Sequence, residues 1–83
     1  MTPAELFHRA GVALFGELYV APLANALKVD KNTVGKWAAG KSEVPAGVWD
    51  ELSIASLDRI IELRRVGDLL ERQTKKARPP REG

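Results

Sequence analysis

Hydrophobic residues recur at helical spacing in four stretches of the chain, and no stretch alternates in the way of a β-strand. The first stretch begins with Thr2-Pro3-Ala4-Glu5, which predicts a capping box with proline at the first helical position. A helix should run from there to about residue 15, closed by Gly16, and Gly11 inside it indicates close packing against another helix. His8 has no evident partner and is expected at the surface or the edge of the core. The expected buried face consists of Leu6, Phe7, Ala10, Ala13 and Leu14.

Two short helices separated by a break are predicted next. The first contains Pro22 in its first turn and ends near residue 27. Lys28-Val29 forms the break, and Asp30 is a good N-cap for a second helix from Lys31 to about Ala39. Helices of two turns are unstable alone, so both must pack against their neighbours. The residues expected to face inward are Leu23, Ala24, Leu27, Val34 and Trp37.

A long helical pattern follows Pro45 and extends to about Gln73 without another proline. Ser53 could divide it into a short helix and a longer one, so the chain is expected to be all-α with four or five helices. The tail from Thr74 is rich in lysine, arginine and proline and is expected to be disordered. The residues expected in the core are Val48, Trp49, Leu52, Leu57, Ile60 and Ile61.

The last apolar residues of this pattern indicate contact with a second subunit. Leu63, Val66, Leu69 and Leu70 are too widely spread for one buried stripe, and they are predicted to form a dimer interface. The expected organisation is a core over residues 1–57, a dimerisation helix over 58–73 and a basic tail over 74–83.

Composition restricts the classes of function. At 83 residues the chain forms one domain, and with no cysteine and one histidine it offers neither a disulfide framework nor a cysteine or histidine metal centre. No cofactor and no small-molecule substrate are expected. Serines 42, 53 and 56 lack a nearby histidine, so no enzymatic activity is expected. There is no long apolar run and no N-terminal signal pattern, which favours a cytoplasmic location without membrane contact.

Charge is mild overall but unevenly placed. The formal net charge is +2, yet Lys28, Lys31, Lys36 and Lys41 gather in one short stretch against Asp30 alone. Such a cluster can attract phosphate groups, although an ordinary solvated face has the same composition.

The two short helices have the features of a pair that crosses at a fixed angle. Ala24 is small enough for the crossing point, and Val34 follows it by ten residues, which pins the second helix across the first. With its inner face held by Val34 and Trp37, the second helix presents its outer face as a rigid rod. The major groove of DNA is wide enough to admit such a rod.

This stretch resembles the helix-turn-helix of the phage lambda repressor and Cro family. The resemblance covers roughly residues 4–57 and is sharpest at Leu23-Ala24, Leu27, Val29, Thr33-Val34, Trp37 and Gly40. Gly47-Val48-Trp49 is similar to the start of the fourth helix of such domains. The chain departs from the family at Lys28, where the turn usually has glycine. A positive φ there would cost lysine about 1 kcal/mol, so the turn either avoids that conformation or accepts the strain.

The resemblance implies roles for individual residues. Base contacts are implied for Lys31, Asn32, Gly35 and Lys36, and phosphate contacts for Thr33, Lys41 and Ser42. Each of these side chains could instead be an ordinary surface or capping residue.

The expected function is that of a sequence-specific transcriptional regulator, a repressor, that binds double-stranded DNA as a homodimer. The alternative is a protein-interaction module, an antitoxin or adaptor, that binds a partner protein through the C-terminal helix. An architectural protein that bends DNA would make the same contacts.

Overall fold

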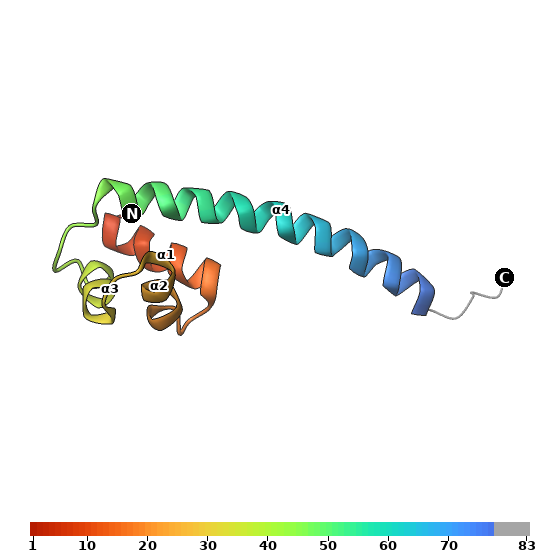
Figure 1. Ribbon diagram of the computed structural model, residues 1–83, viewed down its shortest axis with the longest axis horizontal. Coiled ribbons are helices and arrows are strands. Elements are labelled where there is room, and N and C mark those ends of the chain that lie inside the picture. The colour runs from red at the N-terminus through yellow and green to blue at the C-terminus, as the bar shows by residue number, and fades with distance from the viewer. Residues whose placement is uncertain (78–83) are drawn as a thin grey trace.

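The computed structural model describes residues 1–77, which form four α-helices and no strand. They are α1 (Pro3–Phe15), α2 (Val20–Leu27), α3 (Lys31–Ala38) and α4 (Ala46–Ala77), as Figure 1 shows. The all-α class and the long C-terminal helix are therefore confirmed. Of the two alternatives at Ser53, the structure has the undivided one, because α4 is one continuous helix of 32 residues. Disorder from Thr74 is also wrong as far as Ala77, and the rest of the expected tail lies outside the described residues.

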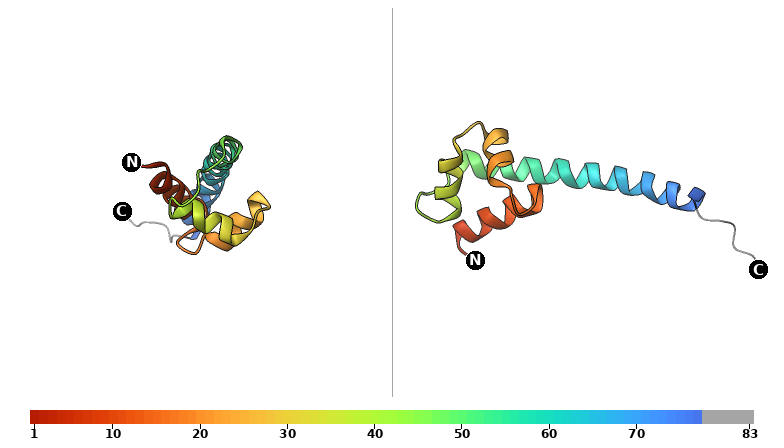
Figure 2. Two further views of the ribbon diagram at one scale, coloured as in Figure 1. Left: turned by 90° about the vertical axis from the view of Figure 1, so that its left-hand side faces the viewer. Right: turned by 90° about the horizontal axis from the view of Figure 1, so that it is seen from below.

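Helix α1 lies at the centre of the fold, between α4 on one side and α2 and α3 on the other (Figures 1 and 2). Its Phe7 is fully buried and touches both tryptophans edge to face, with ring centroids 5.7 Å from Trp37 and 6.3 Å from Trp49. Aromatic pairs prefer this geometry, in which a ring edge meets a ring face. The contact joins α1, α3 and α4 through one side chain, so it fixes how α3 is held.

The predicted N-terminal cap of α1 is present. The Glu5 N–H donates to Thr2 Oγ1 at 3.1 Å, and the Thr2 N–H donates to Glu5 Oε1 at 3.2 Å. The buried stripe of α1 is narrower than predicted, because α1 is buried fully only at Phe7, Gly11 and Leu14, spaced four and three apart. Leu6 is 47% exposed and Ala13 is also exposed, so both were wrongly placed in the core.

Tyr19 is a core residue that the sequence did not reveal, since it lies in the connection before α2. Its ring is buried against Gly11, where any Cβ would overlap it, and its hydroxyl lies 2.8 Å from His8 Nδ1. The close packing expected at Gly11 is thus present, although a connection rather than a helix supplies it. His8 has the partner that the sequence did not show.

Only one face of α4 is covered, and only near its beginning. Leu52 is buried, and Val48, Trp49 and Ala55 pack partly against the core. The last contact of α4 with the other helices is made by Arg59, whose Nη2 donates to the Leu14 carbonyl oxygen at 2.6 Å. We call residues 1–59 the body and residues 60–77 the projecting half; Figure 2 shows the projecting half extending away from the other helices.

The expected core positions Leu57, Ile60 and Ile61 are wrong. They are 59%, 54% and 59% exposed, because three short helices cover a single stripe of α4 and leave its other faces open. Within residues 1–77, no single helix is long and apolar enough to cross a membrane; α1 and α2 would reach that length and composition only together, and they are bent by 93° at their junction.

Candidate nucleic-acid interface

The turn between α2 and α3 shows which backbone conformation Lys28 adopts. Lys28 adopts the left-handed conformation, with φ 57° and ψ 44°, so the chain accepts the strain. The Lys28 N–H donates to the Asn25 carbonyl oxygen at 3.3 Å, and the Val29 N–H donates to that of Ala24 at 3.0 Å. This pair of hydrogen bonds is the Schellman arrangement that ends many helices. The turn is therefore well defined although it lacks glycine.

Helix α3 starts and is anchored as predicted. The Asp30 carboxylate accepts from the Asn32 N–H at 3.3 Å and caps the helix. Val34 is fully buried and Trp37 is 6% exposed, while Ala24 on α2 is 2% exposed beneath them. These three residues fix which face of α3 is turned to solvent.

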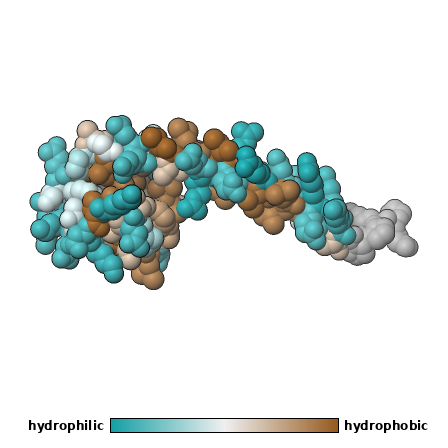
Figure 3. Space-filling view, viewed as in Figure 1, coloured by the Kyte–Doolittle hydropathy of each residue, from teal (hydrophilic) through white to brown (hydrophobic). Residues whose placement is uncertain are grey.

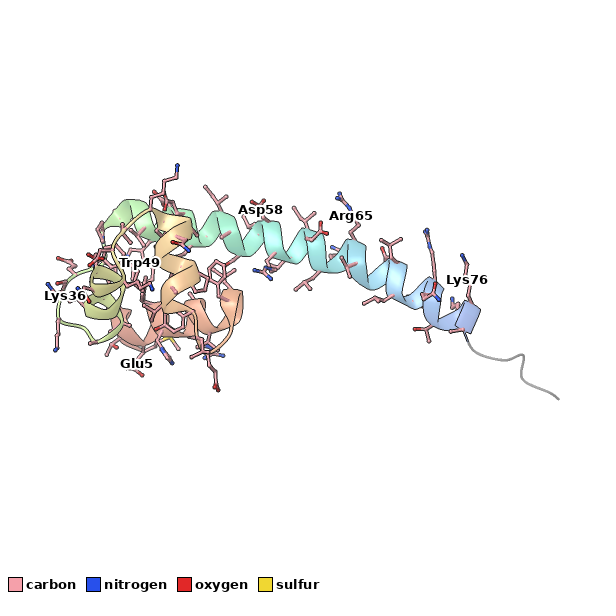
Figure 4. All side chains as sticks on the ribbon, turned by 60° about the horizontal axis from the view of Figure 1, so that its bottom comes forward. Glu5, Lys36, Trp49, Asp58, Arg65 and Lys76 are labelled. Carbon is pink, nitrogen blue, oxygen red and sulfur yellow. The ribbon has the colours of Figure 1, made fainter. Side chains whose placement is uncertain are left out.

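The outer face of α3 gathers most of the predicted contact residues. A shallow surface hollow is lined by Lys31, Asn32, Gly35, Lys36, Ala39 and Lys41. Figure 4 shows Lys36 at the end of the molecule opposite the projecting half of α4, directed away from the body. All four residues that the resemblance assigned to base contacts thus lie together on one accessible surface.

Lys41 joins this group because of how α3 ends. Gly40 has φ 75°, and the Lys41 N–H donates back to the Lys36 carbonyl oxygen at 2.9 Å. The Gly40 N–H donates to the Trp37 carbonyl oxygen at 3.2 Å, so this is a second Schellman turn. The turn folds the chain back beside the last turn of α3. Gly40 was the signal in the sequence that could have placed Lys41 beside Lys36.

The charge of the hollow is not neutralised within the described residues. The ion pairs of residues 1–77 are both on α4, Glu62 with Arg65 and Glu71 with Lys75, each at 3.8 Å. Lys31, Lys36 and Lys41 therefore give the outer face of α3 an unpaired positive charge. Asp30 lies beside them, but its carboxylate is engaged with the backbone of Asn32.

Gly35 is the most informative residue of the hollow. A Cβ built there would have no atom within 4 Å, so packing does not require glycine. Glycine inside a helix costs about 0.5–1 kcal/mol relative to alanine. Packing within the fold gives no reason for Gly35, and its lack of a side chain leaves the backbone of α3 open to close approach from outside.

Two predicted contact residues lie apart from the hollow. Thr33 is half-buried on the flank of α3. Ser42 is exposed and lines a neighbouring hollow, which shares Ala39 and Lys41 with the first and also includes Trp37 and Trp49. The structure therefore brings together five of the seven predicted contact residues.

The described residues contain no metal-binding cluster, and comparisons with other proteins gave no match. In residues 1–77 no three histidine, aspartate or glutamate side chains come close enough to hold a metal ion. Comparison with protein families, curated proteins and solved structures finds no match for this chain.

Proposed function

We propose that the chain is a sequence-specific DNA-binding regulator that inserts α3 into the major groove. The observation that carries the proposal is the outer face of α3, where three unpaired lysines surround Asn32 and a glycine that packing does not require. Lysine donates to guanine O6 and N7, and asparagine pairs with adenine through two hydrogen bonds. With Val34 and Trp37 holding its inner face, α3 keeps one orientation relative to the body.

A homodimer is part of this proposal. One helix of eight residues reads too few base pairs for useful specificity, so two copies on an inverted repeat are expected, acting as a repressor. The interface is proposed at Leu63, Val66, Leu69 and Leu70. Analytical ultracentrifugation of the wild type against a Leu63→Asp/Leu70→Asp variant tests it, and equal monomeric masses would exclude the interface.

Binding-site selection from random DNA is the experiment that tests DNA recognition. The retained pool should contain a two-fold symmetric motif. On that site, Asn32→Ala should relax the preference at one base position, with a loss of about 1–3 kcal/mol there. Lys36→Ala should weaken binding and, if the lysine holds a phosphate, reduce the slope of log affinity against log salt by about one unit.

Arg64→Ala provides the matched control, because it removes one positive charge from the exposed projecting half of α4. Its affinity and salt slope should match those of the wild type. Equal affinity of the wild type, Asn32→Ala and Lys36→Ala for the selected site would show that α3 does not read DNA.

A protein-interaction module is the second candidate, favoured by a different surface. Ile54, Leu57 and Ile61 recur at spacings of three and four on α4 and are 60%, 59% and 59% exposed. Apolar residues in such a row are typical of a helix that binds another protein. A stoichiometric partner that is lost in an Ile54→Lys/Ile61→Lys variant, together with no salt-sensitive DNA binding, would favour this function.

A further inference from the structure

One row of positions on α4, apolar except for Ser56 and Arg59, runs from the body into the projecting half without changing face. Its positions alternate in steps of three and four, which is the heptad spacing of paired helices. Near the body the row packs against the core, and beyond Arg59 nothing in residues 1–77 covers it. Figure 3 shows apolar surface on the side of the projecting half that also carries the body. The row consists of Trp49, Leu52, Ser56, Arg59, Leu63, Val66 and Leu70.

The position of the body restricts how a second helix can cover this row. The body occupies the same face of α4 over residues 46–59 that the row exposes over residues 63–70. If two copies paired these faces in parallel, both bodies would fall between the two α4 helices at the same height. They would have to occupy the same space. An antiparallel pair places the two bodies at opposite ends.

We propose that a second copy of this chain docks on the projecting half in antiparallel orientation, with the two-fold axis at the level of Asp68. This inference rests on the homodimer of the proposed function and specifies its geometry. Leu70 of each copy packs against Val66 of the other, and Leu63 packs against Gln73. Ala77 of the second copy then reaches Arg59 of the first, where the body begins. The described part of the projecting half is long enough for this register.

Slipping the register by a heptad is unfavourable in either direction. Moving the second copy towards the body brings its Ala77 against Leu52, which is only 5% exposed and already covered. Moving it away places Leu70 opposite Gln73 and Val66 opposite Ala77, so that Leu70 and Val66 no longer pack against each other. The proposed register is therefore the one that covers Leu63, Val66 and Leu70 together.

One pair of charges beside the row favours the same orientation. Acidic and basic residues are mixed along the projecting half, with Arg64 and Arg65 near its beginning and Asp68 and Glu71 further on, but beside the row Glu62 lies near the beginning and Lys76 near the end. Antiparallel pairing brings Glu62 of one copy beside Lys76 of the other, twice in each dimer. In a parallel pair these two residues would be separated by 14 positions, about 21 Å along the helix.

Gly67 gives an independent reason for the position of the axis. It lies inside α4, where glycine is unfavourable, and a Cβ there would have no atom within 4 Å in the single chain. In the proposed register the two Gly67 residues lie on the same flank of the contact, two positions or about 3 Å apart along the helix axis. Two glycines at this point let the helix backbones approach closely.

Crosslinking of single-cysteine variants tests the orientation, because the chain contains no cysteine of its own. The variants are Leu63→Cys and Gln73→Cys, both at exposed positions outside the body. Each is treated alone, and then as a mixture, with a short bismaleimide crosslinker, and covalent dimers are counted on a denaturing gel. The mixture should give a covalent heterodimer. Each variant alone should remain monomeric on the gel, because its two cysteines lie about 15 Å apart along the axis.

Two results would overturn the proposal: crosslinking of each variant with itself, which indicates a parallel pair, or no crosslinking in the mixture. Arg64→Cys mixed with Gln73→Cys is the matched control and should give little heterodimer, since Arg64 lies to the side of the row. Glu62→Lys and Lys76→Glu should each weaken dimerisation in ultracentrifugation, and the double variant should restore it. The gel reports pairing without DNA, so a failure of DNA binding leaves this test valid.

Discussion

Replacing Lys28 with glycine should stabilise the body, although it removes a side chain. Lys28 is the one residue other than glycine with positive φ among residues 1–77, and the same Schellman turn after α3 has glycine at the equivalent place, Gly40. The left-handed conformation costs a residue with a Cβ about 1–2 kcal/mol. Glycine removes that cost but gives back about 0.5–1 kcal/mol through the greater freedom of the unfolded chain. We expect a net gain of about 0.5–1 kcal/mol in the free energy of unfolding.

The gain is large enough to measure by thermal unfolding. For a domain of this size, 1 kcal/mol shifts the midpoint by about 4–8 °C, so the Lys28→Gly variant should unfold about 2–8 °C higher than the wild type. Tryptophan fluorescence and circular dichroism at one fixed chain concentration measure the midpoint, since the midpoint of a dimer depends on concentration.

Two further variants isolate the backbone effect. Lys28→Ala removes the same side chain but keeps the Cβ, so its midpoint should stay near that of the wild type. Gly40→Ala introduces a Cβ at φ 75° and should lose about 1–2 kcal/mol. Equal midpoints for Lys28→Gly and Lys28→Ala would refute the assignment of strain to this turn.

Three other predictions concern Gly11, Tyr19 and Gly35. Gly11→Ala should lose about 1–3 kcal/mol despite its better helix propensity, because the new Cβ overlaps the Tyr19 ring; urea unfolding measures the loss, and a stabilised variant would contradict this packing. Burial raises the pKa of the Tyr19 phenol, so stability should be constant below pH about 10 and fall as the pH rises above it. Tyr19→Phe should lose about 1 kcal/mol with the His8 hydrogen bond and show a smaller alkaline decline; an unchanged decline would exclude Tyr19 as its source. Gly35→Ala should stabilise the fold by about 0.5–1 kcal/mol and weaken binding to the selected DNA site, and unchanged affinity would argue against close approach to α3.

Local signals in the sequence predicted the parts of the fold that depend on neighbouring residues. The capping box of α1, the Asp30 cap and the inward pair Val34 and Trp37 all lie where their spacing indicated. The same pair, Val34 and Trp37, also predicted which residues lie on the outer face of α3, because the buried face of a short helix determines its exposed face.

Tertiary packing determined the burial of several residues that the hydrophobic pattern alone did not predict. Tyr19 lies in a connection without helical spacing, and it becomes a core residue because its ring packs directly against Gly11. Leu57 and Ile61 have the same helical spacing as Leu52, but the body is too small to cover more than one stripe of α4. Apolar periodicity indicates that a face will be buried, and it does not indicate which partner buries it.

The length of α4 has a consequence for the operator. Around an axis at the level of Asp68, the two Ala46 residues of the proposed antiparallel dimer lie about 66 Å apart along the helices, at 1.5 Å per residue. Each α3 lies at the same end of the molecule as the first turns of its own α4 (Figure 1). Two turns of B-DNA span about 68–72 Å, so the half-sites should be centred about 20 base pairs apart. A slip of one heptad would change the separation by about 10 Å, or about three base pairs, so the spacing of the operator measures the register of the two helices.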